Sequence, residues 1–77
     1  MINVNLYVFR DKVSGKVGEI IECDNDQVMK RFVETKFNDV PYRSDLQILR
    51  VGSKFVSDDG IPTVTGCDPD VIWRGDL

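Results

Sequence analysis

The first residues of the chain alternate between two kinds of side chain. Aliphatic residues occupy positions 2, 4, 6 and 8, on one side of an extended chain, because successive side chains of a strand point to opposite faces. The other side is polar at Asn3 and Asn5 and aromatic at Tyr7 and Phe9. The pattern predicts a strand over residues 2–9 with one aliphatic face and a second face that turns from polar to aromatic.

A turn and a returning strand are expected next. Ser14-Gly15 lies at the centre of residues 11–16, and glycine supplies the positive φ that a tight hairpin needs. Residues 17–23 are predicted to form the returning strand, with a mixed pattern of apolar and charged side chains. Because short hairpins join antiparallel strands, this strand should pair with the first one.

The apolar spacing then changes from the period of a strand to that of a helix. Asp24, with Gln27 three residues later, has the form of a capping box. The apolar stripe of the predicted helix consists of Val28, Met29, Phe32, Val33 and Phe37. Asn38 is expected to end the helix, and Pro41 prevents its resumption.

Two more strands are predicted in the second half of the chain. Residues 46–51 are apolar on both faces, which is typical of a central strand, and residues 54–56 continue it. The Ser-Asp-Asp-Gly sequence of residues 57–60 predicts a hairpin turn. A return strand over residues 61–65 should lie at an edge of the sheet, because Pro62 lacks a backbone N–H.

This order of elements, β-β-α-β-β, predicts an α+β fold. The simplest architecture is a small antiparallel sheet of four to five strands with one helix packed across a face. We expect a single domain over residues 1–66. Residues 67–77 form a C-terminal tail, in which the apolar cluster at 71–73 is either a short final strand or a docked arm.

The length and the cysteine content limit how the fold is stabilised. A domain of 77 residues hides only about 60% of the surface of its unfolded chain, and such domains often gain stability from a disulfide, a metal or a second subunit. The chain has no histidine and two distant cysteines, Cys23 and Cys67, so we expect no metal site and no cofactor. We expect small, partly buried thiols, with a disulfide between them as the alternative. A homodimer is therefore expected.

The chain has no segment with the features of a signal peptide or a membrane span. Its first residues alternate instead of forming an apolar run, and no window approaches the roughly 20 apolar residues of a transmembrane helix. We therefore expect a cytoplasmic protein without membrane partners.

The residue types argue against catalysis. Histidine, the commonest general acid or base, is absent, and a serine or cysteine nucleophile needs a positioned base. Carboxylate pairs occur at positions 24/26, 58/59 and 68/70, where a helix cap, a hairpin turn and turns around Pro69 explain them. We expect no enzymatic activity and no catalytic residue.

Nucleic-acid binding has suitable residues but an unfavourable overall charge. The net charge of −3 argues against strong, sequence-independent binding to DNA, because such binding relies on Lys and Arg neutralising phosphates. Single-strand binders combine cations with aromatic platforms for bases. The candidates here are Tyr7 and Phe9 as platforms, with Arg10, Lys12, Lys16, Arg50 and Lys54 as cations. From the residues alone, the commoner arrangement packs the two aromatic rings beneath the helix and leaves the charges as a solvated rim.

A protein–protein interface is the third class considered. Tyr42, Trp73 and Arg74 are of the residue types that anchor interfaces. Trp73 either inserts into a neighbouring subunit or folds back on its own core, and the sequence favours neither arrangement.

Several short motifs follow one another along most of the chain. They are Phe9-Arg10-Asp11, Ser14-Gly15, Asn25-Asp26, Lys30-Arg31-Phe32, the stretch Asp45 to Gly52, Phe55, and Ser57-Asp58-Asp59-Gly60. Their order is similar to that of the small nonstructural protein of gokushovirus-type microviruses, which are phages with single-stranded DNA genomes. The resemblance covers roughly residues 4–66. The family's usual Thr-Gly is Ser14-Gly15 here, the second strand lacks the Pro often seen there, and the tail matches nothing in the family.

The resemblance implies a phage protein of the host bacterial cytoplasm that is absent from the virion and acts in genome replication or packaging, with DNA binding proposed. It carries over no catalytic residue. Two functional hypotheses follow. In the first, a dimer binds single-stranded DNA through Tyr7, Phe9 and the neighbouring cations. In the alternative, the protein is an adaptor or regulator for a viral or host replication or assembly protein. Solvent-exposed Tyr7 and Phe9 beside Arg10 and Lys16 would favour DNA, whereas their burial beneath the helix together with an acidic exposed face would favour the adaptor.

Overall fold

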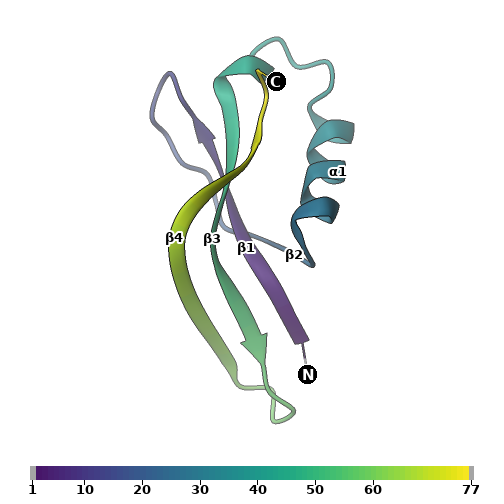
Figure 1. Cartoon of the computed structure of the whole chain (residues 1–77), viewed down its shortest axis with the longest axis vertical. Helices are drawn as coiled ribbons and strands as arrows, with labels where there is room; N and C mark the ends of the chain where they lie inside the picture. The colour runs from purple at the N-terminus through teal and green to yellow at the C-terminus, as the bar shows by residue number, and fades with distance from the viewer. Residues whose placement is uncertain (1, 77) are drawn as a thin grey trace.

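A computed structural model describes residues 2–76 of the chain. The elements follow in the order β1 (Ile2–Asp11), β2 (Ile21–Cys23), α1 (Asp26–Lys36), the single 3-10 turn η1 (Arg43–Asp45), β3 (Leu46–Val56) and β4 (Pro62–Arg74). The four strands form one antiparallel sheet in the order β2-β1-β3-β4, and α1 lies along one side of it (Figure 1). The predicted α+β class and β-β-α-β-β order are confirmed.

Strand β1 lies inside the sheet, between β2 and β3. Its central residues Leu6, Tyr7 and Val8 are buried, as a strand with neighbours on both edges should be. The register with β3 shifts between Leu6, opposite Gly52, and Tyr7, opposite Arg50. This leaves Val51 as the extra residue of a β-bulge, a feature that increases the local twist of a strand.

The helix begins and ends slightly differently from its prediction. Asn25, not Asp24, is the N-cap residue, because its side-chain oxygen accepts a 2.9 Å hydrogen bond from the backbone N–H of Val28. The helix ends at Lys36, before the predicted Asn38. Its buried positions, Met29 and Val33, belong to the predicted stripe.

The returning strand is much shorter than predicted. Only Ile21–Cys23 pairs with β1, opposite Asn5–Tyr7, and a single isolated bridge joins Arg10 to Val17. The prediction of a continuous strand over residues 17–23 was therefore wrong. The mixed apolar and charged pattern of this segment offers no continuous face to bury, and Ile20 is 62% exposed.

The last strand is much longer than predicted. Strand β4 continues from Pro62 to Arg74 and includes most of the segment expected to be a separate tail. Its far half pairs with β3 through Ile48 opposite Trp73 and Leu49 opposite Val71. The apolar cluster at 71–73 is thus strand, as one alternative proposed, but it continues β4 because β3 is long enough to pair with both of its ends, with two register shifts between them.

The hydrophobic core lies between α1 and one face of the sheet. It consists of Tyr7, Met29, Val33, Leu46, Ile48 and Trp73. Phe9 packs against this cluster, and its ring centroid lies 5.0 Å from that of Phe37.

No helix of the described residues 2–76 is long and apolar enough to cross a membrane. Cys23 is half-buried and Cys67 is exposed, and both are free thiols.

Candidate functional site

The predicted aromatic platform lies beneath the helix. Tyr7 is fully buried, and Phe9 is half-buried against Phe37. The face of β1 that carries them is the face covered by Met29 and Val33 of α1. Neither ring therefore has the open face that a stacked base requires, and this part of the predicted DNA site is corrected.

A polar network joins the sheet to the start of the helix. The Asn5 amide donates a 3.0 Å hydrogen bond to the Tyr7 hydroxyl, which donates a 2.7 Å bond to Oδ1 of Asp26. The Arg50 guanidinium donates to the other oxygen of Asp26 and, at 2.9 Å, to Asp70 of β4. Asp26 also lies in the first helical turn, where the helix dipole favours negative charge.

The ionisation of this network follows from its contacts. Burial and the hydrogen bond to Asp26 raise the pKa of Tyr7 to about 12. Burial alone would raise the pKa of Asp26, but hydrogen bonds from Tyr7 and Arg50, together with the charge of Arg50, hold it below its ordinary value. The bond to Asp26 and its charge raise the pKa of Arg50. At neutral pH the network therefore holds a protonated phenol, an ionised carboxylate and a charged guanidinium.

Two of the predicted DNA-binding lysines have acidic partners instead. The Lys12 ammonium lies 3.5 Å from a carboxylate oxygen of Asp76. The Lys54 ammonium donates a 2.8 Å hydrogen bond to Glu22 across the sheet. Like Arg50, these side chains are neutralised within the chain, which reduces their attraction for phosphates.

The remaining two predicted cations lie at the hairpin after β1, where Arg10 bridges to Val17 and the amide of Asp11 donates to the carbonyl of Lys16. Arg10 donates a 2.7 Å hydrogen bond to the neutral side chain of Gln47. Lys16 is exposed in the loop after β1, and its ammonium forms no ion pair with any residue between 2 and 76. The five predicted cations thus do not form one continuous basic groove with an aromatic floor.

Of the predicted interface residues, Trp73 belongs to the core of its own chain. It is only 8% exposed, and its indole N–H donates a 2.8 Å hydrogen bond to Glu34. The Arg43 guanidinium lies 5.2 Å from the Trp73 ring centroid and pairs with Glu34 at 3.0 Å. The alternative in which Trp73 folds back on its own chain is the observed one, so it is not an exposed anchor.

The other two predicted interface residues are exposed. Tyr42 is 53% exposed in the segment between α1 and β3. Arg74 ends β4 and forms a 3.0 Å ion pair with Asp76. Both remain accessible to a partner protein, but they lie in separate elements.

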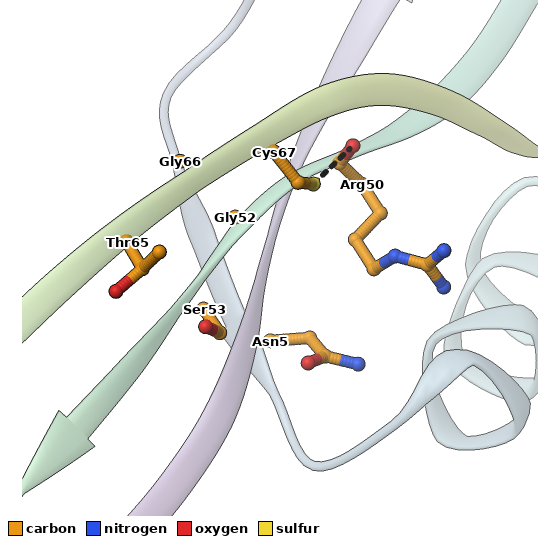
Figure 2. A pocket seen from close by; sticks show the side chains of 7 residues that line it. All are labelled: Asn5, Arg50, Gly52, Ser53, Thr65, Gly66 and Cys67. Atoms are coloured by element: carbon orange, nitrogen blue, oxygen red, sulfur yellow. Dashed lines mark hydrogen bonds between the residues drawn. The ribbon is translucent and has the colours of Figure 1, made fainter.

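A small hollow lies beside the polar network, on the side of the sheet that faces α1 (Figure 2). Its volume is about 230 Å³, below the roughly 300–1,000 Å³ of typical ligand pockets. The lining residues are Asn5, Arg50, Gly52, Ser53, Thr65, Gly66 and Cys67. Arg50, its one charged member, already binds two carboxylates. The hollow therefore has no unpaired charge to hold an ionic ligand.

The face of the sheet opposite α1 is aliphatic, buried at Leu6 and Val8 of β1 and exposed along β4. Residues opposite one another in neighbouring strands point to the same face, so Val8, Leu49 and Val71 form one row across β1, β3 and β4. We call this the open face, because it is opposite to the face that packs on α1, which lies on the other side of the sheet in Figure 1. Val71 is 42% exposed there, and Val64 of the same strand is 64% exposed.

Cations border one end of the open face. Arg10 lies opposite Gln47, and Gln47 lies opposite Arg74. On the open face, these three residues form the next row after Val8, Leu49 and Val71, because the row between them faces α1. The Arg10 guanidinium is hydrogen-bonded to a neutral amide, and its charge remains available to an acidic group. Arg74 is paired with Asp76, so Arg10 supplies the unneutralised positive charge at this end of the open face.

Sequence reasoning missed the open face as a candidate site. The signal was present in the aliphatic positions of β1 and in the apolar pattern on both faces of β3. No comparison, whether with protein-family models, curated proteins or solved structures, finds a match to the chain. The functional argument therefore rests on the geometry.

Proposed function

We propose that this chain is a non-enzymatic adaptor that binds another protein through the open face of its sheet. The observation that carries the proposal is the pair of exposed valines that β4 carries on this face, Val64 at 64% and Val71 at 42% exposed. Exposed apolar side chains on one face are a common mark of a protein–protein contact. Their burial contributes about 25 cal/mol per Å² of apolar area removed from water.

The charges at the end of the open face indicate the chemistry of the partner. Arg10 of β1 and Arg74 of β4 lie on either side of Gln47 of β3, and Arg74 is paired with Asp76. A matching surface has an aliphatic centre and carboxylates at one end, because complementary charge sets orientation and speeds association. We propose a viral or host replication or assembly protein with such a surface.

The structure weakens the features on which direct DNA binding depended. Tyr7 is fully buried, and Lys12, Arg50 and Lys54 are paired with carboxylates. The net charge of −3 also opposes contact with phosphates. Burial of the aromatic pair is one of the two conditions stated for the adaptor hypothesis, and together with the paired cations it is why we place the adaptor ahead of single-stranded DNA binding.

The motif resemblance supplies the biological setting of the proposal. It supports a phage nonstructural protein that acts in genome replication or packaging in the cytoplasm of the infected bacterium. The non-enzymatic part is supported by the network of Tyr7, Asp26 and Arg50, since each of these groups is engaged in joining α1 to the sheet.

Site-specific photo-crosslinking tests the adaptor proposal. A photo-reactive amino acid is placed at Val71, on the open face, or at Val13, which is 77% exposed in a loop and serves as the matched control. Crosslinking is carried out in infected cells, with Val71→Lys and Val13→Lys competitors. Separately, fluorescence anisotropy follows a labelled single-stranded oligonucleotide as salt is varied.

The adaptor proposal expects one discrete protein crosslinked from Val71 and not from Val13, without oligonucleotide binding at low salt. Excess Val13→Lys protein should compete with this crosslink, whereas Val71→Lys should not, because it puts a charge on the apolar contact. Equal crosslinking from both positions would overturn the proposal. Salt-dependent oligonucleotide binding that Val71→Lys does not alter would instead restore DNA as the partner.

A further inference from the structure

Strand β4 has a long free edge. It comprises the 13 residues Pro62–Arg74 and is last in the sheet order, so one of its edges pairs with β3 and no strand among residues 2–76 pairs with the other. Residues 62–71 are all exposed. A free edge presents backbone N–H and C=O groups that can pair with another chain.

The near half of this edge lacks the usual protection against pairing. Proteins block free edges with charged side chains, prolines or bulges. Pro69, Asp68 and Asp70 protect the far half, but residues 63–67 have the sequence Thr-Val-Thr-Gly-Cys, without charge or proline. Threonine and valine also favour extended structure.

The hairpin contacts define which backbone groups face the free edge. The amide of Ser57 donates a 3.1 Å hydrogen bond to the carbonyl of Ile61, so the backbone groups of Ile61 point toward β3. In an antiparallel strand the N–H and C=O of a residue point to the same side, and the side alternates. Pro62, Val64 and Gly66 therefore face outward, and the missing N–H of Pro62 leaves no carbonyl acceptor of β3 unpaired.

We propose that a second copy of this chain pairs with this edge, antiparallel, with Thr65 on the two-fold axis. In this register the amide of Val64 donates to the carbonyl of the partner's Gly66, and the amide of Gly66 donates to the carbonyl of the partner's Val64. The two-fold symmetry repeats both bonds, which is the isologous arrangement of a closed dimer.

The side chains of the edge fit the same register. Val64, 64% exposed on the open face, comes to lie beside the partner's Gly66, where no side chain obstructs it. Thr65 comes opposite the partner's Thr65, a favourable pair across strands. Residues 63–67 carry no charged side chain, so no like charges meet within the paired segment.

Such a dimer would join two four-stranded sheets into one continuous sheet. Its two-fold axis is perpendicular to the sheet, so both open faces lie on the same side and form one larger aliphatic surface. The edge pairing does not depend on the proposed adaptor function, since it uses the backbone of residues 63–67 and not the row of Val71.

Sedimentation equilibrium of the full chain tests the edge dimer. The edge contact is smaller than the roughly 800 Å² per partner of a standard interface, so the measurement uses roughly 100 μM protein. Val64→Pro removes an outward N–H that β3 does not use, and Val64→Thr is the control that keeps this N–H. Circular dichroism verifies that each variant is folded.

Disulfide trapping provides a second measurement if Val64→Pro does not fold. Both native cysteines are replaced, as Cys23→Ser and Cys67→Ser, and Thr65→Cys is introduced. Thr65 would form a non-hydrogen-bonded pair with the partner's Thr65, with Cα atoms about 4.5 Å apart, within the range that a disulfide spans. Thr35→Cys, on the exposed side of α1, is the matched control.

The expected result is a wild-type mass of twice the 8.8 kDa of one chain. The dissociation constant should be raised about tenfold or more by Val64→Pro, which removes two of four hydrogen bonds, and little by Val64→Thr. Thr65→Cys should form a disulfide-linked dimer much faster than Thr35→Cys. A monomeric wild type, or equal trapping at both positions, would overturn the edge dimer, while crosslinking from Val71 would still test the adaptor separately.

Discussion

The Tyr7 hydroxyl donates a 2.7 Å hydrogen bond to Oδ1 of Asp26 and so ties the sheet to the first residue of α1. The two residues are 19 positions apart in sequence, and Tyr7 lies in a central strand. The same bond satisfies a phenol that is otherwise fully buried. It therefore helps determine which face of the sheet the helix covers, and thus which face remains open.

Tyr7→Phe should destabilise the fold while preserving its packing. The substitution removes only the hydroxyl, which is bonded to a charged carboxylate, so we expect a loss of about 1–3 kcal/mol in the free energy of unfolding. Urea unfolding monitored by the fluorescence of Trp73 measures this loss. Tyr42→Phe is the control, because Tyr42 is 53% exposed and should contribute little. Equal effects of the two substitutions would contradict the role assigned to the buried hydroxyl.

Stability should fall at alkaline pH because Tyr7 must stay protonated. The folded state raises the pKa of Tyr7 from 10.0 to about 12. Its contribution is fully present below the pKa of the unfolded chain and is lost as pH rises through the folded pKa, a decrease of up to about 2–3 kcal/mol. Urea unfolding at successive pH values checks this, with phenol absorbance reporting ionisation. Tyr7→Phe should lack the loss of stability that ionisation of Tyr7 causes. An identical dependence of stability on pH in both proteins would refute this role of Tyr7.

Stability should also fall at acid pH because Asp26 must stay ionised. Hydrogen bonds from Tyr7 and Arg50 overcome the effect of burial and hold the pKa of Asp26 below its ordinary value of 3.8. The resulting stabilisation is present above that ordinary value and is lost as pH falls through the folded pKa. NMR titration of the Asp26 carboxyl gives the folded pKa directly. Asp26→Asn should reduce stability at neutral pH and flatten its acid dependence, and a folded pKa at or above the ordinary value would rule this account out.

Gly75→Ala should disturb the closure of the core at the end of β4. Gly75 is buried, and an added Cβ would overlap the backbone carbonyl of Arg43, whose guanidinium in turn bonds to the Gly75 carbonyl. We expect a loss of about 1–3 kcal/mol, as for other overpacked sites. Thermal unfolding provides the measurement. Gly18→Ala is the control, since its Cβ would meet Phe9 only at 3.9 Å, and equal stability of both variants would disprove the close contact.

Much of the fold was predictable from local pattern. The alternation of β1 and the helical spacing of Met29 and Val33 each specify an element without help from distant residues. The lengths of β2 and β4 were mispredicted, because strand length depends on the neighbour as much as on the strand itself. Residues 17–20 find no continuous partner, whereas Asp70, Val71, Trp73 and Arg74 pair with β3 although Pro69 precedes them.

The candidate site was less predictable than the fold. The residues predicted to bind DNA were identified by type, but their environment depends on partners far away in sequence. Lys54 meets Glu22 from 32 positions away, and Arg50 meets Asp26 from 24 positions away. A cation is available to phosphate only where no carboxylate neutralises it, and this property cannot be read from neighbouring residues in the chain.

The sequence by itself determined that β1 has two faces and that one helix would cover one of them. Only the tertiary structure decided which face is covered. Both are apolar enough to bury, so period two alone cannot choose between them. The helix covers the face of Tyr7 because Leu46, Ile48 and Trp73 complete the core on that side. Asp26 also accepts a hydrogen bond from the Tyr7 hydroxyl there. As a consequence no helix covers the aliphatic face, which is buried at Leu6 and Val8 and exposed at Val64 and Val71 of β4.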